Sequence, residues 1–124
     1  MNKNDNNTNI QELKNLAADF RDKRDWLQFH DPKNLAEAIS IEAGELLELF
    51  LWQTPEQIAD KLKNQAGFKE EVGDELADII NFCLNFSDVT GIDISEEVIK
   101  KLEKSEQKYP ADKAKGVATK YTKL

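Results

Sequence analysis

Cysteine, histidine, proline and glycine are all scarce in this sequence of 124 residues, and the shortages exclude several classes of protein. A single cysteine, Cys83, excludes a disulfide framework and predicts a reducing compartment. A single histidine, His30, argues against a carboxylate-bridged di-iron bundle, which needs paired Glu-x-x-His motifs. The five glycines form no phosphate-binding loop, and no apolar run reaches the length of a membrane span. We therefore expect a soluble, cytoplasmic protein of one domain, without a signal peptide and without membrane contacts.

Basic charge is also scarce in the middle of the chain. Residues 34–91 hold three lysines and twelve acidic residues, whereas the whole chain has a net charge of −7. Nucleic-acid phosphates would meet like charge in this region, so we expect no nucleic-acid surface. The charge instead fits a site that meets phosphate through a metal ion, helped by lysines from elsewhere in the chain.

The sequence does contain two acidic motifs inside apolar helical patterns. Glu42 and Glu45 form the first motif, and Glu71, Glu75 and Asp78 form the second. On a helical wheel of about 100° per residue, the acids of each motif fall within about 60° of one another and among apolar residues. Those apolar residues are Leu35, Ala38, Leu46 and Leu49 in the first stretch, and Phe68, Val72, Ile79, Phe82 and Phe86 in the second. We therefore expect five carboxylates to face the core, with no lysine or arginine on either stripe.

Clustered carboxylates in an apolar setting repel one another and need a compensating cation. Oxygen ligands suit hard divalent ions, so the pattern predicts Mg²⁺, with Mn²⁺ or Ca²⁺ as substitutes. Because Mg²⁺ keeps waters that a phosphate can displace, the pattern favours metal-assisted phosphate chemistry. The alternative is that the acids are the solvated face of ordinary surface helices. One motif alone would favour that alternative, whereas two motifs on apolar stripes argue against it.

The hydrophobic pattern predicts an all-α domain over residues 9–110, between a disordered tail at 1–8 and a basic tail at 111–124. The main helices are expected at about residues 10–26, 34–52, 68–90 and 93–110. Asp31 or Asn34 is expected to cap the second of these helices, and Asp93 or Ser95 to start the fourth. A capping box from Thr8 to Gln11 is expected to begin the first helix. Thr54 and Pro55 predict the start of a short helix or a mobile connection that ends near residue 66.

The first predicted helix has a polar face that we interpret as solvated. It carries Lys14, Asp19, Arg21, Asp22, Lys23 and Asp25. Trp26 and His30 follow in an aromatic-rich connection. Trp26 is suited either to stacking on a base or to closing the end of a small bundle. His30 is suited to being a ligand or a general base, although a single loop histidine more often has a structural role.

The third long helix is apolar on two sides, because Leu76, Ile80 and Leu84 face away from its acidic stripe. Gly73 and Ala77, four residues apart, would let another helix approach closely. In so small a protein, such a helix is expected to be central or to form a dimer interface, and we favour both.

Several stretches resemble the MazG-like nucleotide pyrophosphohydrolases of the all-α NTP pyrophosphatase superfamily, and the dCTP pyrophosphatase branch is the most similar. The stretches are residues 24–30, 32–35, 42–46, 49–52 and 74–78, together with 108–110, 113–116 and 120–121 near the C-terminus. The likeness covers about residue 10 to the end. Its Glu-x-x-Glu and Glu-x-x-Asp pair is moderately specific alone and strongly specific with the flanking aromatic residues.

The resemblance implies a four-helix MazG-like bundle that completes its core as a homodimer, often assembled further into a homotetramer. It implies a Mg²⁺-dependent enzyme of nucleotide-pool house-cleaning that hydrolyses a (deoxy)nucleoside triphosphate to the monophosphate and pyrophosphate. By position, the metal ligands would be Glu42, Glu45, Glu75 and Asp78. Glu71 would be a further ligand or the base that deprotonates water.

The resemblance also implies where substrate binds. Trp26 and Trp52 would line the base pocket, with His30 near it. The candidates for contacts with the phosphates are Lys101, Lys108 and Tyr109. Phe82 stands where relatives often have tyrosine, so a hydroxyl that could read the base or the sugar is absent and the base preference stays open.

Two other functions are kept as alternatives. An enzyme like phosphoribosyl-ATP pyrophosphohydrolase shares the fold, although the paired tryptophans favour a free nucleotide. A non-enzymatic helical module would expose apolar stripes to a partner protein, but it has no use for acids within them. Stabilisation by Mg²⁺ that depends on the acids would distinguish an enzyme from a module.

Overall fold

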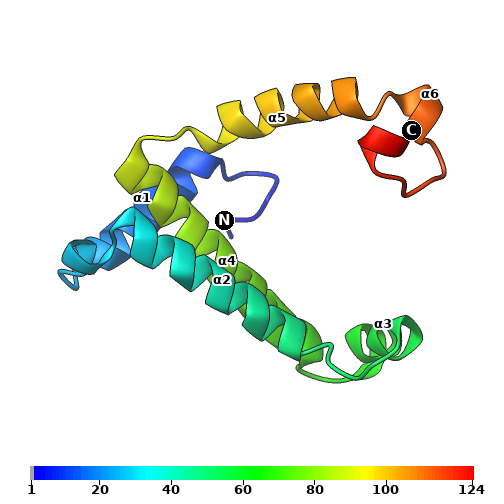
Figure 1. Ribbon diagram of the computed structural model, residues 1–124. Helices are drawn as coiled ribbons and strands as arrows, with labels where there is room; N and C mark the ends of the chain where they lie inside the picture. The colour runs from blue at the N-terminus through cyan, green and yellow to red at the C-terminus, as the bar shows by residue number, and fades with distance from the viewer. Residues whose placement is uncertain (1) are drawn as a thin grey trace. The chain divides into compact units, whose positions relative to one another are not determined.

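The computed structural model describes residues 2–124, which contain α-helices, short 3-10 helices and turns but no strand. The α-helices are α1 (Ile10–Asp22), α2 (Pro32–Glu48), α3 (Pro55–Asn64), α4 (Phe68–Thr90), α5 (Ile94–Lys108) and α6 (Ala111–Ala114) (Figure 1). The 3-10 helices are η1 (Leu27–Phe29) and η2 (Tyr121–Lys123). The chain divides into two compact units, one up to Gly91 and the other from Ile92 to Leu124. The predicted all-α fold is confirmed.

Helix α4 is the central element of the first unit and contacts α1, α2 and α3. It lies side by side with α2 over most of the length of α2 (Figure 1). The most buried apolar side chains are Leu35 on α2 together with Phe68 and Leu84 on α4, each no more than 3% exposed. The ring of Phe50 packs edge-on against Phe68, with 6.3 Å between the ring centroids. These apolar contacts hold the two helices that carry the acidic motifs against each other.

Helix α1 begins one residue later than the predicted capping box. Asn9, rather than Thr8, is the N-cap: its side chain accepts a hydrogen bond from the backbone N–H of Glu12 at 2.9 Å. The Glu12 carboxylate in turn accepts from the backbone N–H of Asn9 at 2.9 Å. The Thr8 hydroxyl instead donates to the side chain of Asn7 at 3.2 Å. The box predicted from Thr8 to Gln11 is therefore wrong by one residue.

Helices α1 and α2 both end four residues earlier than predicted. Their predicted ends were Trp26 and Trp52, but α1 ends at Asp22 and α2 at Glu48. Asp25 has a φ of +54° and Trp52 a φ of +61°, in the left-handed region that a right-handed helix cannot use. Apolar residues continue past both ends, so the hydrophobic pattern alone did not locate them.

The other predicted helix boundaries agree more closely with the structure. Asp31 caps α2 with Pro32 in its first turn, and the segment after Thr54 is a true helix, α3, with a complete capping box. Helix α4 has the predicted bounds, and its C-cap is Gly91, whose φ of +74° favours glycine. Asp93 caps α5.

The second unit contains more structure than a plain basic tail. After α5, the one-turn helix α6 and the turn η2 bring Tyr121 against Tyr109, with 5.8 Å between the ring centroids. The ammonium of Lys108 lies 4.9 Å from the centre of the Tyr121 ring.

Across residues 2–124, no helix is long and apolar enough to cross a membrane.

Candidate metal centre and adjoining pocket

Helices α2 and α4 bring acidic side chains from the two motifs together. Glu42 on α2 and Glu75 and Asp78 on α4 each offer a carboxylate oxygen, and these oxygens lie within 4.8 Å of one another. The side chain of Glu45 also interacts with both Glu42 and Glu75. Four of the five predicted acids therefore meet where α2 packs against α4, and we call Glu42, Glu45, Glu75 and Asp78 the acidic cluster.

The half-buried acids of the cluster lack the partners that buried oxygens require. The Oε2 atoms of Glu42 and Glu75 are buried and accept no hydrogen bond. Among the ion pairs of the described residues, none involves an acid of the cluster. A buried carboxylate oxygen without a donor is costly, and a hard divalent cation would satisfy it. The donor set, made of oxygen atoms alone, fits Mg²⁺ or Mn²⁺.

The pKa values of Glu42 and Glu75 are raised, as expected for carboxylates that lack a compensating cation. Burial, a hydrogen bond that protonated Glu42 donates to Glu45, and the nearby charges of Glu45, Asp78 and Glu75 raise the pKa of Glu42 to about 7. Burial, together with the charge of Glu45, also raises the pKa of Glu75. Without a cation, the cluster thus retains a proton in place of a metal ion near neutral pH.

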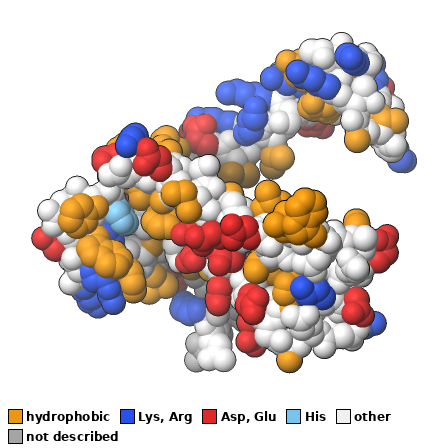
Figure 2. Space-filling view, turned by 60° about the horizontal axis from the view of Figure 1, so that its bottom comes forward, with side chains coloured by type: hydrophobic (Ala, Val, Ile, Leu, Met, Phe, Trp, Pro, Cys, Tyr) orange, Lys and Arg blue, Asp and Glu red, His pale blue; other side chains and the backbone are white. Residues whose placement is uncertain are grey.

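The prediction that all five acids face the core is wrong for three of them. Glu45, Glu71 and Asp78 are exposed, and only Glu42 and Glu75 are half-buried. Glu71, one helical turn before Glu75, lies outside the group of three whose oxygens converge. The apolar stripes of α2 and α4 pack against each other, but the acids lie along the margin of that contact. Figure 2 shows acidic side chains gathered in a patch with hydrophobic side chains beside it.

A cavity of about 440 Å³ lies beside the acidic cluster. Asp78 belongs both to the cluster and to the cavity wall. Three residues predicted to bind substrate, Trp26, His30 and Phe82, also line this cavity. One residue of α4 therefore belongs both to the candidate metal-binding group and to the wall of an aromatic pocket.

The aromatic wall of the cavity is held by contacts among its own side chains. Phe20 packs edge-on against Trp26 with 5.9 Å between ring centroids, and the guanidinium of Arg24 lies 3.6 Å from the centre of the Phe20 ring. The ring centroids of His30 and Phe82, two further residues of the cavity wall, are 6.5 Å apart. The Nδ1 atom of His30 is buried without a hydrogen-bond partner. The His30 ring therefore lines the cavity with one nitrogen that has no partner among the described residues.

Arg21, Asn81 and Asn85 also line the cavity, although none of them was predicted to be a site residue. The interpretation of Arg21 as a solvated residue is wrong, because it is only 4% exposed. Helix α1 packs against α4 with the side that carries Arg21 facing α4. One signal could have identified it: Arg21 follows Leu13 and Ala17 at intervals of four residues, so all three share a stripe.

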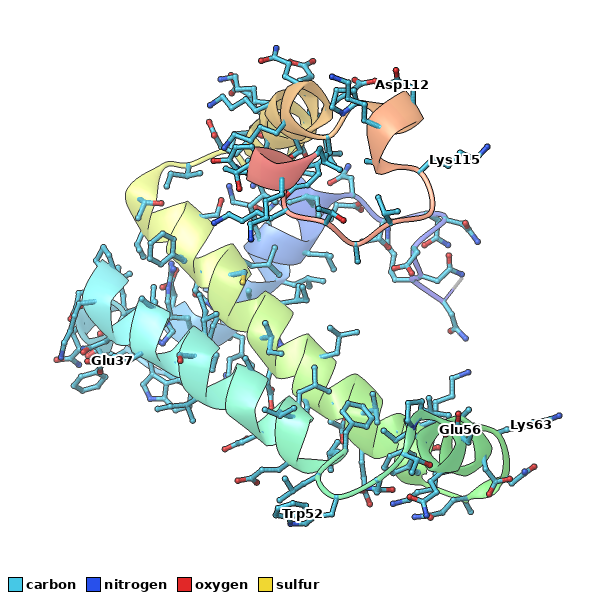
Figure 3. The ribbon with its side chains drawn as sticks, turned by 45° about the vertical axis from the view of Figure 1, so that its right-hand side comes forward. Glu37, Trp52, Glu56, Lys63, Asp112 and Lys115 are labelled. Atoms are coloured by element: carbon cyan, nitrogen blue, oxygen red, sulfur yellow. The ribbon has the colours of Figure 1, made fainter. Side chains whose placement is uncertain are left out.

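The remaining predicted substrate residues lie outside this cavity. Trp52, on the connection between α2 and α3, is 93% exposed and points away from the helices (Figure 3). Lys101, Lys108 and Tyr109 belong to the second unit. Their contacts with substrate stay predictions.

Comparison with known proteins agrees with the resemblance found in the motifs. A model described as the MazG-like family matches residues 38–124. The chain is 36% identical to dCTP pyrophosphatase 1 of Rattus norvegicus and 33% identical to that of Homo sapiens. Each comparison spans 118 residues, or 93% of this chain and 67% of the relative. A solved pyrophosphatase structure from Archaeoglobus fulgidus is 40% identical, with a TM-score of 0.76 over 89% of this chain and 98% of that chain. This chain therefore belongs to the MazG-like family.

Proposed function

We propose that this protein is a Mg²⁺-dependent enzyme that converts a nucleoside triphosphate to the monophosphate and pyrophosphate, with a dCTP-like or modified deoxynucleotide favoured. The enzyme class, a nucleoside triphosphate pyrophosphohydrolase, follows from the family and from the similarity to dCTP pyrophosphatases and to a pyrophosphatase of known structure. The observation that carries the proposal is the convergence of Glu42, Glu75 and Asp78 within 4.8 Å beside an aromatic cavity.

The acidic cluster is the proposed Mg²⁺ site. Glu42, Glu75 and Asp78 would hold the ion, with Glu45 beside them as the fourth acid. The bound ion would supply Lewis-acid polarisation of the phosphate and a lowered pKa of bound water. The buried, unbonded oxygens of Glu42 and Glu75 support this assignment, because they lack any other partner.

The protein's own residues would position the triphosphate for attack at the α-phosphorus. A water oxygen forms the new P–O bond, and pyrophosphate leaves with the electrons of the broken bond. Glu71 would accept the proton from this water or serve as a further ligand. Trp26 and Phe82 would hold the base by stacking, and the buried Nδ1 of His30 would bond to the base or the sugar. The proposed phosphate contacts of Lys101, Lys108 and Tyr109 would stabilise the charge on the leaving group.

We also propose that the enzyme is a homodimer, with a dimer of dimers as a further step. Leu76 and Ile80 on α4 are 51% and 44% exposed, and Ile41 and Leu47 on α2 are 61% and 66% exposed. A small protein that leaves these side chains in water gains by covering them with a second copy. Trp52, which does not line the cavity of its own chain, would then contribute to a site that the partner subunit completes.

The test is a panel of canonical and modified nucleoside triphosphates, assayed with Mg²⁺ for pyrophosphate and for orthophosphate. We expect pyrophosphate release that stops when Mg²⁺ is chelated. Glu42→Gln should lower kcat by at least about 10²-fold, because the site loses a charged ligand. The same substitution relieves repulsion in the cluster, so the variant should stay folded. Glu48→Gln, an exposed acid on α2 outside the cluster, is the matched control. Release of orthophosphate would contradict the proposed scissile bond.

A further inference from the structure

Arg21 is a buried charge whose partners come from two helices. It is 4% exposed, at the end of α1. Its Nε and Nη2 atoms donate to the two carboxylate oxygens of Asp22 at 2.8 and 3.2 Å. Its Nη1 atom donates to Asp88 at 2.7 Å and to the amide oxygen of Asn85 at 3.4 Å. A guanidinium removed from water is stable only with such partners, so these four residues act as one group, which we call the Arg21 clamp.

The Arg21 clamp joins two helices that are far apart in sequence. Arg21 is 64 residues from Asn85 and 67 from Asp88, and both partners lie on α4. By contrast, the ion pairs Lys33–Glu37 and Glu96–Lys100 each lie within one helix, and the pair Asp19–Lys23 joins the last turn of α1 to its C-cap. The clamp therefore constrains how the last turn of α1 sits on α4.

The cavity lies between the same two helices. Its α1 wall includes Ala17, Phe20 and Arg21, and its α4 wall includes Phe82 and Asn85. Apolar packing leaves this side of α1 incompletely held, because Phe20 remains 53% exposed. The polar tie at Arg21 therefore joins the two walls of the cavity, and we expect it to help set their separation.

The clamp also fixes an amide in the cavity wall. Asn85 is 7% exposed, and its Nδ2 atom donates to the backbone oxygen of Asn81 at 2.9 Å. Because its Oδ1 atom accepts from Arg21, the two ends of the amide cannot exchange. Asn81 and Asn85 both line the cavity, so Arg21 sets the orientation of a polar group in the wall of the proposed nucleotide pocket.

We propose that Arg21 is a positioning residue for nucleotide binding: it holds the α1 wall of the pocket against α4 and orients Asn85. This inference rests on the proposed function, because the cavity is the proposed nucleotide pocket. A preformed pocket lowers the ordering cost of binding, whereas the chemistry occurs at the acidic cluster. Loss of the clamp should therefore change KM much more than kcat.

The experiment compares Arg21→Gln and Arg21→Lys with the control Lys23→Gln, which breaks an exposed ion pair at the C-cap of the same helix. Steady-state kinetics on the best triphosphate and calorimetric binding of its monophosphate are measured well below the melting temperature of each variant. We expect Arg21→Gln to raise KM and the monophosphate Kd by about tenfold with kcat within about twofold. Arg21→Lys should show a smaller rise, because it keeps the charge but loses the planar fork. Lys23→Gln should leave KM, kcat and the monophosphate Kd unchanged. Mg²⁺ should stabilise every variant as much as it stabilises the wild type.

Asn85→Ala keeps the ion pairs of Arg21 and removes the amide, so it tests the inference even if Arg21→Gln does not fold. We expect a raised KM here as well, at unchanged kcat. Folded variants with unchanged KM and monophosphate Kd would show that the clamp is only structural and would overturn the inference alone. A lower kcat at unchanged KM would overturn it too, since the clamp would then act on the acidic cluster. A wild-type protein that neither binds nor hydrolyses nucleotides would instead overturn the proposed function.

Discussion

At the scale of single residues, Glu42 is the acid whose environment departs most clearly from water. Burial comes first among the causes that raise its pKa, and the hydrogen bond that protonated Glu42 donates to Glu45 comes second. One of its oxygens is buried and unbonded. The charged form of Glu42 is therefore unfavourable until a cation replaces the proton, so stability, pH and metal binding are linked at this residue.

The metal-free protein should consequently lose a contribution to stability between about pH 4.5 and about pH 7. Folding raises the pKa of Glu42 from 4.5 to about 7, so the folded state binds the proton more tightly than the unfolded state. This contribution is complete below pH 4.5 and is lost as pH rises through 7. Mg²⁺ competes with the proton, so the stabilisation by Mg²⁺ should grow over the same range. Thermal melts with chelator and with Mg²⁺ measure both effects.

Glu42→Gln is the control for this pH prediction, because it removes the titrating group. Other carboxylates also make stability depend on pH, since the pKa values of Glu12 and Asp22, for example, are lowered by their partners. The quantity to compare is therefore the difference in melting temperature between wild type and Glu42→Gln at each pH. A difference that does not change with pH would refute the role assigned to Glu42.

At the scale of elements, hydrophobic periodicity identified each long helix, and local polar contacts decided where each helix starts and stops. The bounds of α4 agree with the prediction because Phe68 begins its apolar pattern and Gly91 adopts a left-handed conformation. The ends of α1 and α2 do not agree. Asp25 and Trp52 take that same conformation without being glycine, and no general pattern predicts this.

The start of α1 tests whether local polar contacts decide where a helix begins. Asn9→Ala removes the side-chain acceptor for the N–H of Glu12 and should lower the free energy of unfolding by about 1 kcal/mol. Thr8→Ala, the matched control, leaves that hydrogen bond in place and should change it by less than about 0.5 kcal/mol. Urea denaturation followed by circular dichroism measures both variants. A larger loss of unfolding free energy in Thr8→Ala than in Asn9→Ala would show that Thr8 is the cap.

At the scale of the whole molecule, the first unit has fewer buried apolar side chains than its hydrophobic residues would allow. Only Leu35, Phe68 and Leu84 are fully buried among the apolar residues of the described chain. Leu76 and Ile80, predicted to line a second apolar side of α4, are about half exposed. A Cβ at Gly73 of the same helix would meet no atom within 4 Å. This side of α4 therefore has room for another helix, as the proposed homodimer requires.

Ile80→Glu should convert the proposed dimer to a monomer. At 44% exposure the new carboxylate stays solvated in a single chain, whereas burial against a second copy would be costly. Size-exclusion chromatography with light scattering measures the mass, and circular dichroism checks the fold. Lys63→Glu, an exposed residue of α3 (Figure 3), should leave the mass unchanged. A wild-type protein that is monomeric, or an Ile80→Glu variant that stays dimeric, would contradict this interface.

The sequence by itself determined the helical class, the main helices, the two acidic motifs and the family. Each of these depends on residues within one or two helical turns of each other, where periodicity and capping act. The oxygen-rich character of the candidate metal site is equally local, because it is set by residue type.

Only the tertiary structure decided which acids converge and what lies beside them. Glu42 meets Glu75 and Asp78 because particular faces of α2 and α4 pack together, and the same packing leaves Glu71 exposed outside that group. Arg21 became a buried residue of the cavity wall because α1 packs against α4 near Asp88. Contacts between distant helices depend on the burial of whole faces, and no short stretch of sequence specifies which faces will meet.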